Sequence, residues 1–416
     1  MPHTILGTSS RSDLTLSLED RVRHLAVVGA TGSGKSNLLR HIARQDIGRG
    51  DGLLVLDPLG DLSAAILGDI PQWRWNHVCF LNAADFEQPV GLNVLEDTQP
   101  DDRARVVDGF VSAMRSVHYE NWGPRLETIL RHGSTALIET GGSLVLMPQL
   151  LIDDEYRRAI VSKVTNHETR EFFGKRFEKW RDTFRDEAID PVLNKVEAFL
   201  AFPSVRMILG QTSTLDLQYA MNNERIVIVN LAMGVIGETA SRLMGALILA
   251  HVRAAAMARA SIPVEERKPF HLIADEVHSF GPASVARLLQ ETRQYRLSVT
   301  LATQFLDALA ESTRSALLGN AKTLAAFRCG PGDAQVLAQH FARLHQAFNE
   351  TALLELDDGE AVISAPGREA THVSVPPPQP IRSSEAVRKQ SRRHYGRPRI
   401  EVERYIARKL GYSLPN

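Results

Sequence analysis

A glycine-rich loop with one lysine and one serine is the clearest chemical motif in the chain. Residues 29–36 read GATGSGKS, which fits the phosphate-loop pattern G-x-x-x-x-G-K-[ST]. An apolar run precedes the loop at residues 24–28, and residues 37–43 follow it with helical spacing. Backbone N–H groups in such a loop turn toward a β-phosphate, and the helix N-terminus adds a positive dipole end. The residues expected to contact a nucleotide are Gly29, Ala30, Thr31, Gly32, Ser33, Gly34, Lys35, Ser36 and Asn37.

Two residues of this loop and two carboxylates farther along have the types that nucleotide hydrolysis requires. Lys35 is predicted to reach the β- and γ-phosphates, and the Ser36 hydroxyl to hold Mg²⁺. Residues 272–276 read LIADE, an apolar strand with acidic residues at its carboxyl end. Asp275 would orient a water on Mg²⁺ or bind the metal directly, and Glu276 would polarise the water that attacks the γ-phosphate. A solvated strand end is the alternative, but the loop upstream argues against it because ligands bind at this edge of a parallel sheet.

Three further polar residues complete the candidates for catalysis. Gln304 ends the next strand, where a glutamine can hold the lytic water or sense loss of phosphate. Arg293 and Arg328 are candidates for an arginine finger that stabilises charge in a neighbouring subunit, and the sequence does not distinguish them. The alternatives are a polar strand end for Gln304 and surface ion pairs for both arginines. Asp57 and Asp61 follow another apolar run, where they order the loop, serve Mg²⁺ or only form a turn.

The composition bounds the class of protein. The 416 residues are 44% hydrophobic and 23% charged, with a net charge of −1, so no global basic field attracts nucleic acid. Cys79 and Cys329 each lie in an apolar run, so we expect both to be buried free thiols in a reducing compartment. No signal peptide is visible, and no apolar run approaches the length that spans a bilayer. We therefore expect no integral membrane segment and a cytoplasmic protein, peripheral to the inner membrane only through partners.

The elements that position the candidate residues alternate between strands and helices. Strands are expected at residues 53–57, 77–81, 225–231, 270–274, 298–304 and 323–329. This alternation indicates an α/β fold with a mainly parallel sheet, which residues 359–364 are expected to close. Between the second and third of these strands, helical spacing and few β-branched runs indicate an all-α insertion. The expected boundaries are 1–20 for an N-terminal β-hairpin, 21–98 and 216–375 for the two halves of the nucleotide-binding domain, 99–215 for the insertion, and 376–416 for a stiff proline linker and basic tail.

The ordered set of motifs resembles the HerA/FtsK superfamily. The set comprises GATGSGKS preceded by Arg23 and His24, then VLDPLGDL, NWGPRLETIL, IADE, TRQYRLSVTLATQ and AAFRCGPGDAQVLAQHF. Over about residues 5–375 the chain is most similar to the soluble ATPase part of type IV secretion coupling proteins, the conjugative DNA pumps. The resemblance implies a RecA-like (ASCE) P-loop ATPase that uses ATP and Mg²⁺ and forms a ring, usually a homo-hexamer, around DNA.

The resemblance also assigns roles to individual residues, and the chain departs from the family in one respect. Lys35 and Ser36 match the phosphate-loop pair, Asp275 and Glu276 the acidic pair, Gln304 the glutamine after the sensor strand, and Arg293 the family's arginine. Coupling proteins usually begin with transmembrane helices, and we expect none in this sequence. Soluble HerA members, which act in DNA processing and in phage defence with a nuclease, therefore remain a second comparison.

Contacts with DNA and with partners are predicted less specifically. Residues 232–237 and 278–282 are candidates for loops that grip phosphates, because a ring motor needs no base-reading motif. Residues 382–409 carry ten basic and three acidic residues, about +7, and so form a local polyanion patch. An apolar stripe of Val402, Tyr405, Ile406 and Leu410 could dock on a partner or on the protein's own body.

The sequence favours a DNA translocase and leaves two other functions open. One is a scaffold that binds ATP as an assembly switch and recruits a nuclease or secretion partner. The other is a protein-secretion ATPase of the same superfamily, which DNA would not stimulate. The partners that correspond to these functions are a relaxase, a secretion channel or a nuclease.

Overall fold

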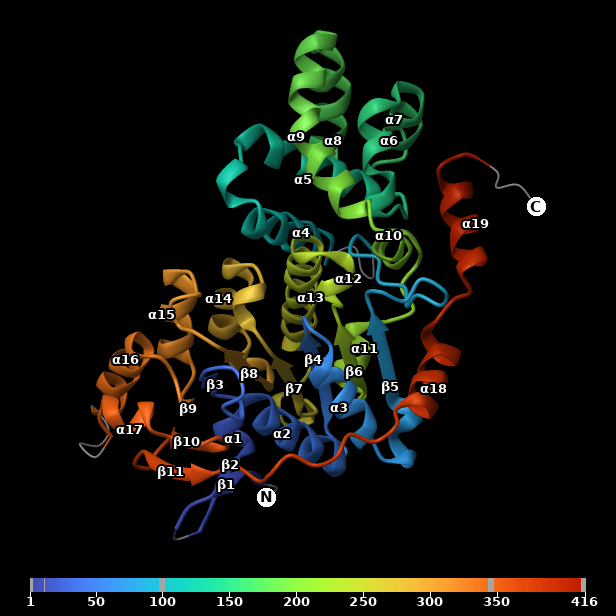
Figure 1. Ribbon diagram of the computed structural model, residues 1–416. Helices are drawn as coiled ribbons and strands as arrows, with labels where there is room; N and C mark the ends of the chain where they lie inside the picture. Colours follow the sequence, from blue (N-terminus) through green and yellow to red (C-terminus); the bar gives the residue numbers. More distant parts are fainter. Residues whose placement is uncertain (1–2, 11, 97–101, 343–347, 413–416) are drawn as a thin grey trace.

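One mixed β-sheet runs through the part of the chain that the computed structural model describes, residues 3–10, 12–96, 102–342 and 348–412 (Figure 1). Its strands are β1 (His3–Thr8), β2 (Asp13–Ser17), β3 (Leu25–Val28), β4 (Gly52–Asp57), β5 (Val78–Asn82), β6 (Ile226–Asn230), β7 (Phe270–Ala274), β8 (Leu297–Thr303), β9 (Thr323–Phe327), β10 (Glu360–Ser364) and β11 (Thr371–Ser374).

The sheet is parallel where the predicted nucleotide site lies and antiparallel beyond it. Its order is β2-β1-β11-β10-β9-β3-β8-β7-β4-β6-β5, and the strands from β9 to β5 are parallel. β10, β11, β1 and β2 continue the sheet with antiparallel pairs. The expectation that residues 359–364 close the sheet is wrong, because β11 and the N-terminal hairpin add three more strands beyond β10.

Helices cover both faces of the parallel strands, which is why those strands are apolar on both sides. In β4, Leu53 and Val55 pack with the helices of one face, whereas Leu54 and Leu56 pack into the core of the other. The helices of the first face are α2 (Lys35–Arg49), α3 (Asp61–Asp69) and α18 (Glu385–Tyr395). Those of the second are α13 (Glu238–Ala258), α14 (Pro282–Glu291), α15 (Glu311–Asn320) and α16 (Pro331–Ala342). Shorter helices are α1 (Leu18–Arg21), α11 (Leu217–Asn222), α12 (Met233–Ile236) and α17 (Glu350–Leu354).

Between β5 and β6 the described residues form helices without a named strand. These helices are α4 (Arg103–Val117), α5 (Pro124–Glu139), α6 (Met147–Ile152), α7 (Asp154–Val161), α8 (His167–Glu171), α9 (Asp182–Leu200) and α10 (Pro203–Gly210). Prolines begin α5 and α10, where the fixed φ of proline suits the first helical position. The group stands above the carboxyl ends of β4, β5 and β6, and α4 packs on α13 (Figure 1). The structure confirms the expected fold class, a mainly parallel α/β sheet with an all-helical insertion.

The expectation that no apolar run approaches the length needed to cross a membrane is wrong for helix α13. By length and composition alone, the helix at residues 238–261 could cross a membrane. However, 61% of its most apolar stretch is buried inside the protein. The helix packs against α4, α11 and α14, so its apolar character is that of a core helix.

A buried ion pair ties the N-terminal segment to α2. Arg21 Nη1 and Nη2 donate to the two oxygens of Asp46, each over 2.9 Å, and both residues are buried. Burial alone would raise the pKa of Asp46, but the charges of Arg21 and His271 outweigh it, so the pKa lies below its ordinary value. Asp46, Asp51 and His271 bring their ligand atoms within 4.8 Å of one another, but Arg21 pairs with Asp46 and Arg49 pairs with both carboxylates, so two guanidinium groups already balance their charge. We therefore assign it a structural role.

The C-terminal segment lies across the sheet domain as a strap, which we define as residues 376–384. Arg40 of α2 donates to the backbone oxygens of Gln379 (2.5 Å) and Pro380 (3.2 Å) and is paired with Asp69 (2.6 Å), whose side chain is 4% exposed. Asn37 Nδ2 donates to Pro376 O over 2.5 Å. The strap thus follows the helix that begins in the glycine-rich loop.

Beyond the strap, the two last helices dock on the protein's own body. α18 lies along β5, and α19 (Arg399–Lys409) packs on α10, as the red helices of Figure 1 show. Val402 and Ile406 of the predicted apolar stripe are buried in the main core. Of the two alternatives for this stripe, the structure shows self-docking.

Candidate active site

The glycine-rich loop is held between the carboxyl ends of two strands. Gly29 N donates to Thr303 O at the end of β8 (3.3 Å), and Ala30 N donates to Arg328 O after β9 (2.8 Å). Gly34 has φ = +115°, and a Cβ there would lie 3.1 Å from the backbone of Gly359. Only glycine fits at this position, since both the left-handed φ and the close approach exclude a side chain.

Lys35 and Ser36 begin α2 and face the two carboxylates that follow β7. Lys35 is 5% exposed, and its Nζ donates to Ala30 O over 3.0 Å, inside its own loop. Burial lowers the pKa of Lys35, and the negative charges of Glu276 and Asp275 partly offset that effect. Ser36 Oγ donates to Asp275 Oδ2 over 3.2 Å. The sheet therefore brings these residues together from positions 239 apart in the chain.

Asp275 is held in an environment that disfavours its charge. Burial raises the pKa of Asp275 to about 6, and the adjacent Glu276 carboxylate contributes in the same direction. The Asp57 carboxylate raises this pKa further, although Asp57 is itself committed to its loop. Its oxygens accept the backbone N–H groups of Leu59, Gly60 and Ser63. Of the roles left open for Asp57, its contacts are those of a loop-ordering residue.

Glu276 and Gln304 form a hydrogen-bonded chain that ends on the glycine-rich loop. Gln304 Nε2 donates to Glu276 Oε1 (2.6 Å), and Thr31 Oγ1 donates to Gln304 Oε1 (2.9 Å). This contact is possible because β8 pairs directly with β3, in the register Val28 to Thr303. Glu276 has a left-handed φ of 47°, which is costly for a non-glycine residue. Its Oε2 is buried without a hydrogen bond, with Nδ1 of His278 3.4 Å away.

The two arginines lie at opposite ends of the parallel strands, Arg328 after the carboxyl end of β9 and Arg293 before the start of β8. Arg328 follows β9 beside the loop, and its side chain pairs with Asp358 over 2.7 Å. Arg293 is exposed and begins the 3₁₀ turn before β8. Burial lowers the pKa of the His24 imidazole, and the nearby charge of Arg293 lowers it further. The seven residues of β8 separate Arg293 from Gln304, about 20 Å of strand. Arg293 therefore lies outside the loop cluster, whereas Arg328 lies at its edge.

A pocket of about 550 Å³ opens beside the loop, and part of its wall was not predicted from the sequence. Lys35, Ser36 and Asn37 form one side. The other side consists of residues 357–360, before and at the start of β10, and of Pro377 and Pro378 in the strap. Gly359 N donates to Ser33 O over 2.9 Å and so fixes this wall against the loop. No local motif marks these residues, because their contacts join segments about 320 to 340 positions apart.

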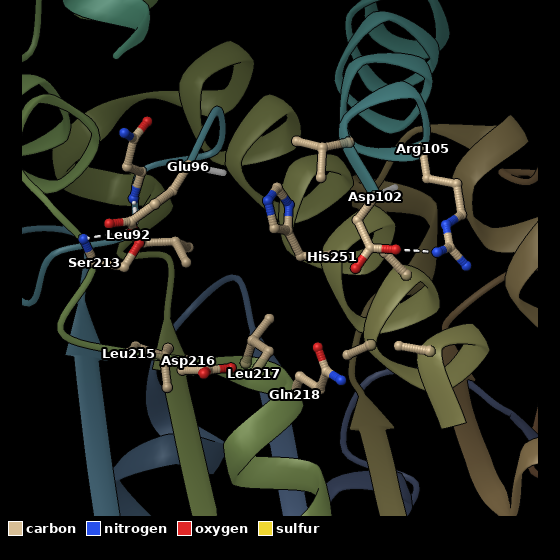
Figure 2. A pocket seen from close by; sticks show the side chains of 15 residues that line it. Leu92, Glu96, Asp102, Arg105, Ser213, Leu215, Asp216, Leu217, Gln218 and His251 are labelled. Atoms are coloured by element: carbon tan, nitrogen blue, oxygen red, sulfur yellow. Dashed lines mark hydrogen bonds and ion pairs between the residues drawn. The ribbon is translucent and has the colours of Figure 1, made fainter. Parts of the chain in front are cut away.

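A second pocket lies between the insertion and the sheet domain, away from the loop (Figure 2). It has a volume of about 290 Å³, and three carboxylates and one arginine line it. Glu96 accepts the Ser213 N–H over 2.8 Å, Asp102 pairs with Arg105, and Asp216 caps α11. Because each carboxylate already has a partner in the fold, we assign this pocket no ligand.

Comparisons with known proteins agree with this geometry. Residues 4–101 match the family model described as Helicase HerA, central domain. Among solved structures, the plasmid coupling protein TrwB in complex with the GTP analogue GDPNP has a TM-score of 0.62 and 19% identity, with 91% of each chain covered. TrwB in complex with ADP and Mg²⁺ has a TM-score of 0.61 and 18% identity, with 92% of each chain covered. VirB4 of Thermoanaerobacter pseudethanolicus has a TM-score of 0.60 and 13% identity over 90% of this chain and 96% of that one. No curated protein matches the sequence.

The chain has the fold of the P-loop proteins TrwB and VirB4, and its first quarter matches the HerA central domain. The resemblance recognised in the sequence is thereby confirmed, and the strand order explains why motifs far apart in sequence meet. In this fold, the phosphate loop and the acidic pair share one edge of the parallel strands.

The residues present in this ATPase fold fit a magnesium nucleotide. The Ser36 hydroxyl and the Asp275 carboxylate are hard oxygen ligands, which Mg²⁺ prefers, and they already lie 3.2 Å apart. The buried Oε2 of Glu276 has no hydrogen bond, and burial together with the neighbouring carboxylates of Glu276 and Asp57 raises the pKa of Asp275. Opposite them, Lys35 and the N-terminus of α2 supply positive charge and backbone N–H groups for phosphate oxygens.

Proposed function

We propose that the protein hydrolyses ATP and uses the energy to move DNA through a ring of identical subunits. One observation supports this proposal above the others: Lys35, Ser36, Asp275, Glu276 and Gln304 gather at one edge of a parallel sheet. The likeness to TrwB, a conjugative coupling protein, and to the HerA central domain supports the choice of DNA as the substrate.

The hydrolytic step follows from the chemistry of these side chains. Lys35 and the loop N–H groups hold the β- and γ-phosphates, and Ser36 with Asp275 hold Mg²⁺, which neutralises phosphate charge when bound. Glu276 accepts a proton from the attacking water as that water adds to the γ-phosphorus and ADP leaves. Gln304 keeps the Glu276 carboxylate oriented through its 2.6 Å hydrogen bond, and Thr31 orients Gln304 in turn.

In this proposal, the two arginines act on nucleotides that are bound to different subunits. Arg328 serves the nucleotide of its own chain, because its backbone carbonyl binds the phosphate loop over 2.8 Å. Arg293 is too far from its own site and serves as the finger of the next subunit. Mixing Arg293→Ala subunits with Glu276→Gln subunits tests this division. Active mixed rings, formed from two preparations that are each inactive alone, support it, and mixtures with no regained activity count against it.

The pathway proposed for the protein is conjugative or type IV secretion transport in the cytoplasm, peripheral to the membrane through partners. A relaxase, a secretion channel or, in a HerA-like process, a nuclease is the proposed partner. The likeness to a conjugative coupling protein over about nine-tenths of both chains favours the first two.

The decisive experiment combines ATPase activity with mass in solution. We expect Mg²⁺-dependent hydrolysis, stimulated by double-stranded DNA, in a species whose light-scattering mass is a multiple of 46.1 kDa. Lys35→Ala is expected to abolish hydrolysis with and without DNA. Hydrolysis that DNA leaves unchanged, together with no salt-dependent DNA binding, would favour a protein-secretion ATPase, and nucleotide binding without turnover would favour a scaffold.

A further inference from the structure

Helix α18 is fixed along the outer edge strand of the sheet. Phe80 N of β5 donates to Ser391 Oγ over 2.7 Å, which satisfies an edge amide that would otherwise have no partner. Val387 is buried against the core on the same side of the helix. The Arg388 guanidinium lies 4.9 Å from the ring centroid of Phe80. These contacts set the rotation of α18, and therefore the direction in which its remaining side chains point.

The basic residues of α18 gather around a groove of about 760 Å³ beside β5, which we call the α18 groove. Four cationic side chains line it against a single carboxylate, Glu385, so the lining carries a net charge of +3. The cationic residues of the lining are Arg388, Lys389, Arg392 and Arg393. Such a concentration of charge is notable in a chain whose total net charge is −1.

Two of these cations are engaged within the protein and two are free for a ligand. Arg392 pairs with Asp85 over 2.8 Å, and Arg388 Nε donates to Ser384 Oγ over 3.0 Å. Lys389 and Arg393 are exposed and make no hydrogen bond or ion pair among the described residues. They are four positions apart, one helical turn or about 6 Å along the axis. The groove therefore offers two adjacent, unpaired positive charges.

We propose that the α18 groove binds the phosphate backbone of DNA, as a contact separate from the ring's pore loops. This inference rests on the proposed function, that the protein acts on DNA. Asn82, Gln88 and Ser383 add polar side chains that can hydrogen-bond phosphate and sugar oxygens. A protein partner would need a buried apolar anchor, whereas the one aromatic residue of the lining, Phe80, is covered by Arg388. Since no groove residue is arranged to read base edges, binding is expected to be independent of sequence.

The test removes the two free charges and compares the result with a matched change nearby. Lys389→Gln with Arg393→Gln is the test variant of the full-length protein. Arg404→Gln with Arg408→Gln, two exposed cations of α19 in the same basic tail, is the control. Fluorescence anisotropy with a double-stranded oligonucleotide is measured over a series of salt concentrations. The test variant should bind roughly tenfold more weakly, and its plot of log K against log salt should be shallower by about two units, whereas the control keeps the wild-type slope.

Each outcome supports or overturns the proposal. A test variant with the wild-type slope overturns the α18 groove, while DNA-stimulated ATPase in the wild type leaves the proposed function standing. An equal loss in the control assigns the effect to the tail's general charge and overturns the groove as well. Wild-type protein that binds polyglutamate but not DNA overturns both proposals and indicates an acidic protein partner. The ATPase rate without DNA should be the same in all three proteins, because neither pair of residues contacts the nucleotide pocket.

Discussion

Replacing Glu276 by glutamine separates proton acceptance from every other property of the candidate site. Glutamine has the same size, and its Oε1 can still accept the 2.6 Å hydrogen bond from Gln304 Nε2. What changes is Oε2, a buried oxygen without a hydrogen bond, which becomes an NH₂ group that cannot take a proton. The substitution therefore removes the base and leaves the shape of the site.

The size of the effect follows from what a positioned base contributes. General-base catalysis is worth about 10²–10⁴ in rate, or about 3–5 kcal/mol of barrier. We expect Glu276→Gln to lower single-turnover hydrolysis of radiolabelled ATP by that factor. Nucleotide affinity should not fall, because Glu276 contributes negative charge beside Lys35 and its removal does not weaken attraction for phosphate. Equilibrium titration with a fluorescent nucleotide measures this second quantity.

Glu360, which lines the pocket beside the phosphate loop, provides a matched control. Its carboxylate pairs with His372 Nε2 over 3.2 Å. Glu360→Gln should therefore hydrolyse ATP at close to the wild-type rate. If Glu276→Gln turned over within tenfold of wild type, Glu276 could not be the base. If it lost nucleotide binding together with turnover, the carboxylate would be structural instead.

Three further predictions concern the loop, the buried ion pair and the strap. Gly34→Ala should weaken nucleotide binding in a titration more than Gly32→Ala: both glycines have a left-handed φ, so both changes strain the backbone, but only at Gly34 would the Cβ also crowd the backbone of Gly359, whereas at Gly32 it meets nothing within 4 Å. Asp46→Asn should lower the free energy of unfolding in urea by about 3–5 kcal/mol at pH 7, because it leaves a buried guanidinium unpaired. Since the folded-state pKa of Asp46 is lowered from 3.8, this stabilisation is present above about pH 4 and is lost as the pH falls through the folded pKa, so the wild-type and variant stabilities should converge in acid. Arg40→Ala should destabilise the protein by about 3 kcal/mol and expose the strap to proteolysis, whereas Arg44→Ala, a more exposed side chain whose Nε lies 3.7 Å from the same carboxylate, should have little effect.

The parallel core was predictable from the sequence because burial on both faces leaves continuous apolar runs. The apolar runs of β4 and β7 could be recognised without tertiary information. Because ligands bind at the carboxyl ends of parallel strands, Lys35 and Glu276 could then be predicted to lie at one edge of the sheet. β11 was missed because two of its four residues are exposed and only one is buried, so its strand character depends on pairing with β10. The same limit applies to Asp57, whose loop-ordering role is decided by three N–H contacts and not by its type.

The strap illustrates why the remaining wall of the pocket could not be predicted. Prolines at residues 376–380 predict a stiff linker, which is correct for the local backbone and gives no direction in space. Its course is set by Asn37 and Arg40, which bind its carbonyl oxygens from 339 positions earlier in the chain. Periodicity and propensity describe neighbours within a few residues, so a contact of this range leaves no local pattern.

Several unfavourable features concentrate at the one edge where the motifs meet. Glu276 has a left-handed backbone and a buried oxygen without a hydrogen bond, Asp275 has a pKa raised to about 6, and burial lowers the pKa of Lys35. None of these features is needed to end a strand, since β7 is complete at Ala274. A bound divalent cation would favour the ionised form of Asp275, and a polyphosphate would favour the charged form of Lys35, so one ligand relieves both costs. These unfavourable features are expected in a site that binds a magnesium nucleotide, because the bound ligand would offset them. A strand end with a purely structural role would have no reason to contain them.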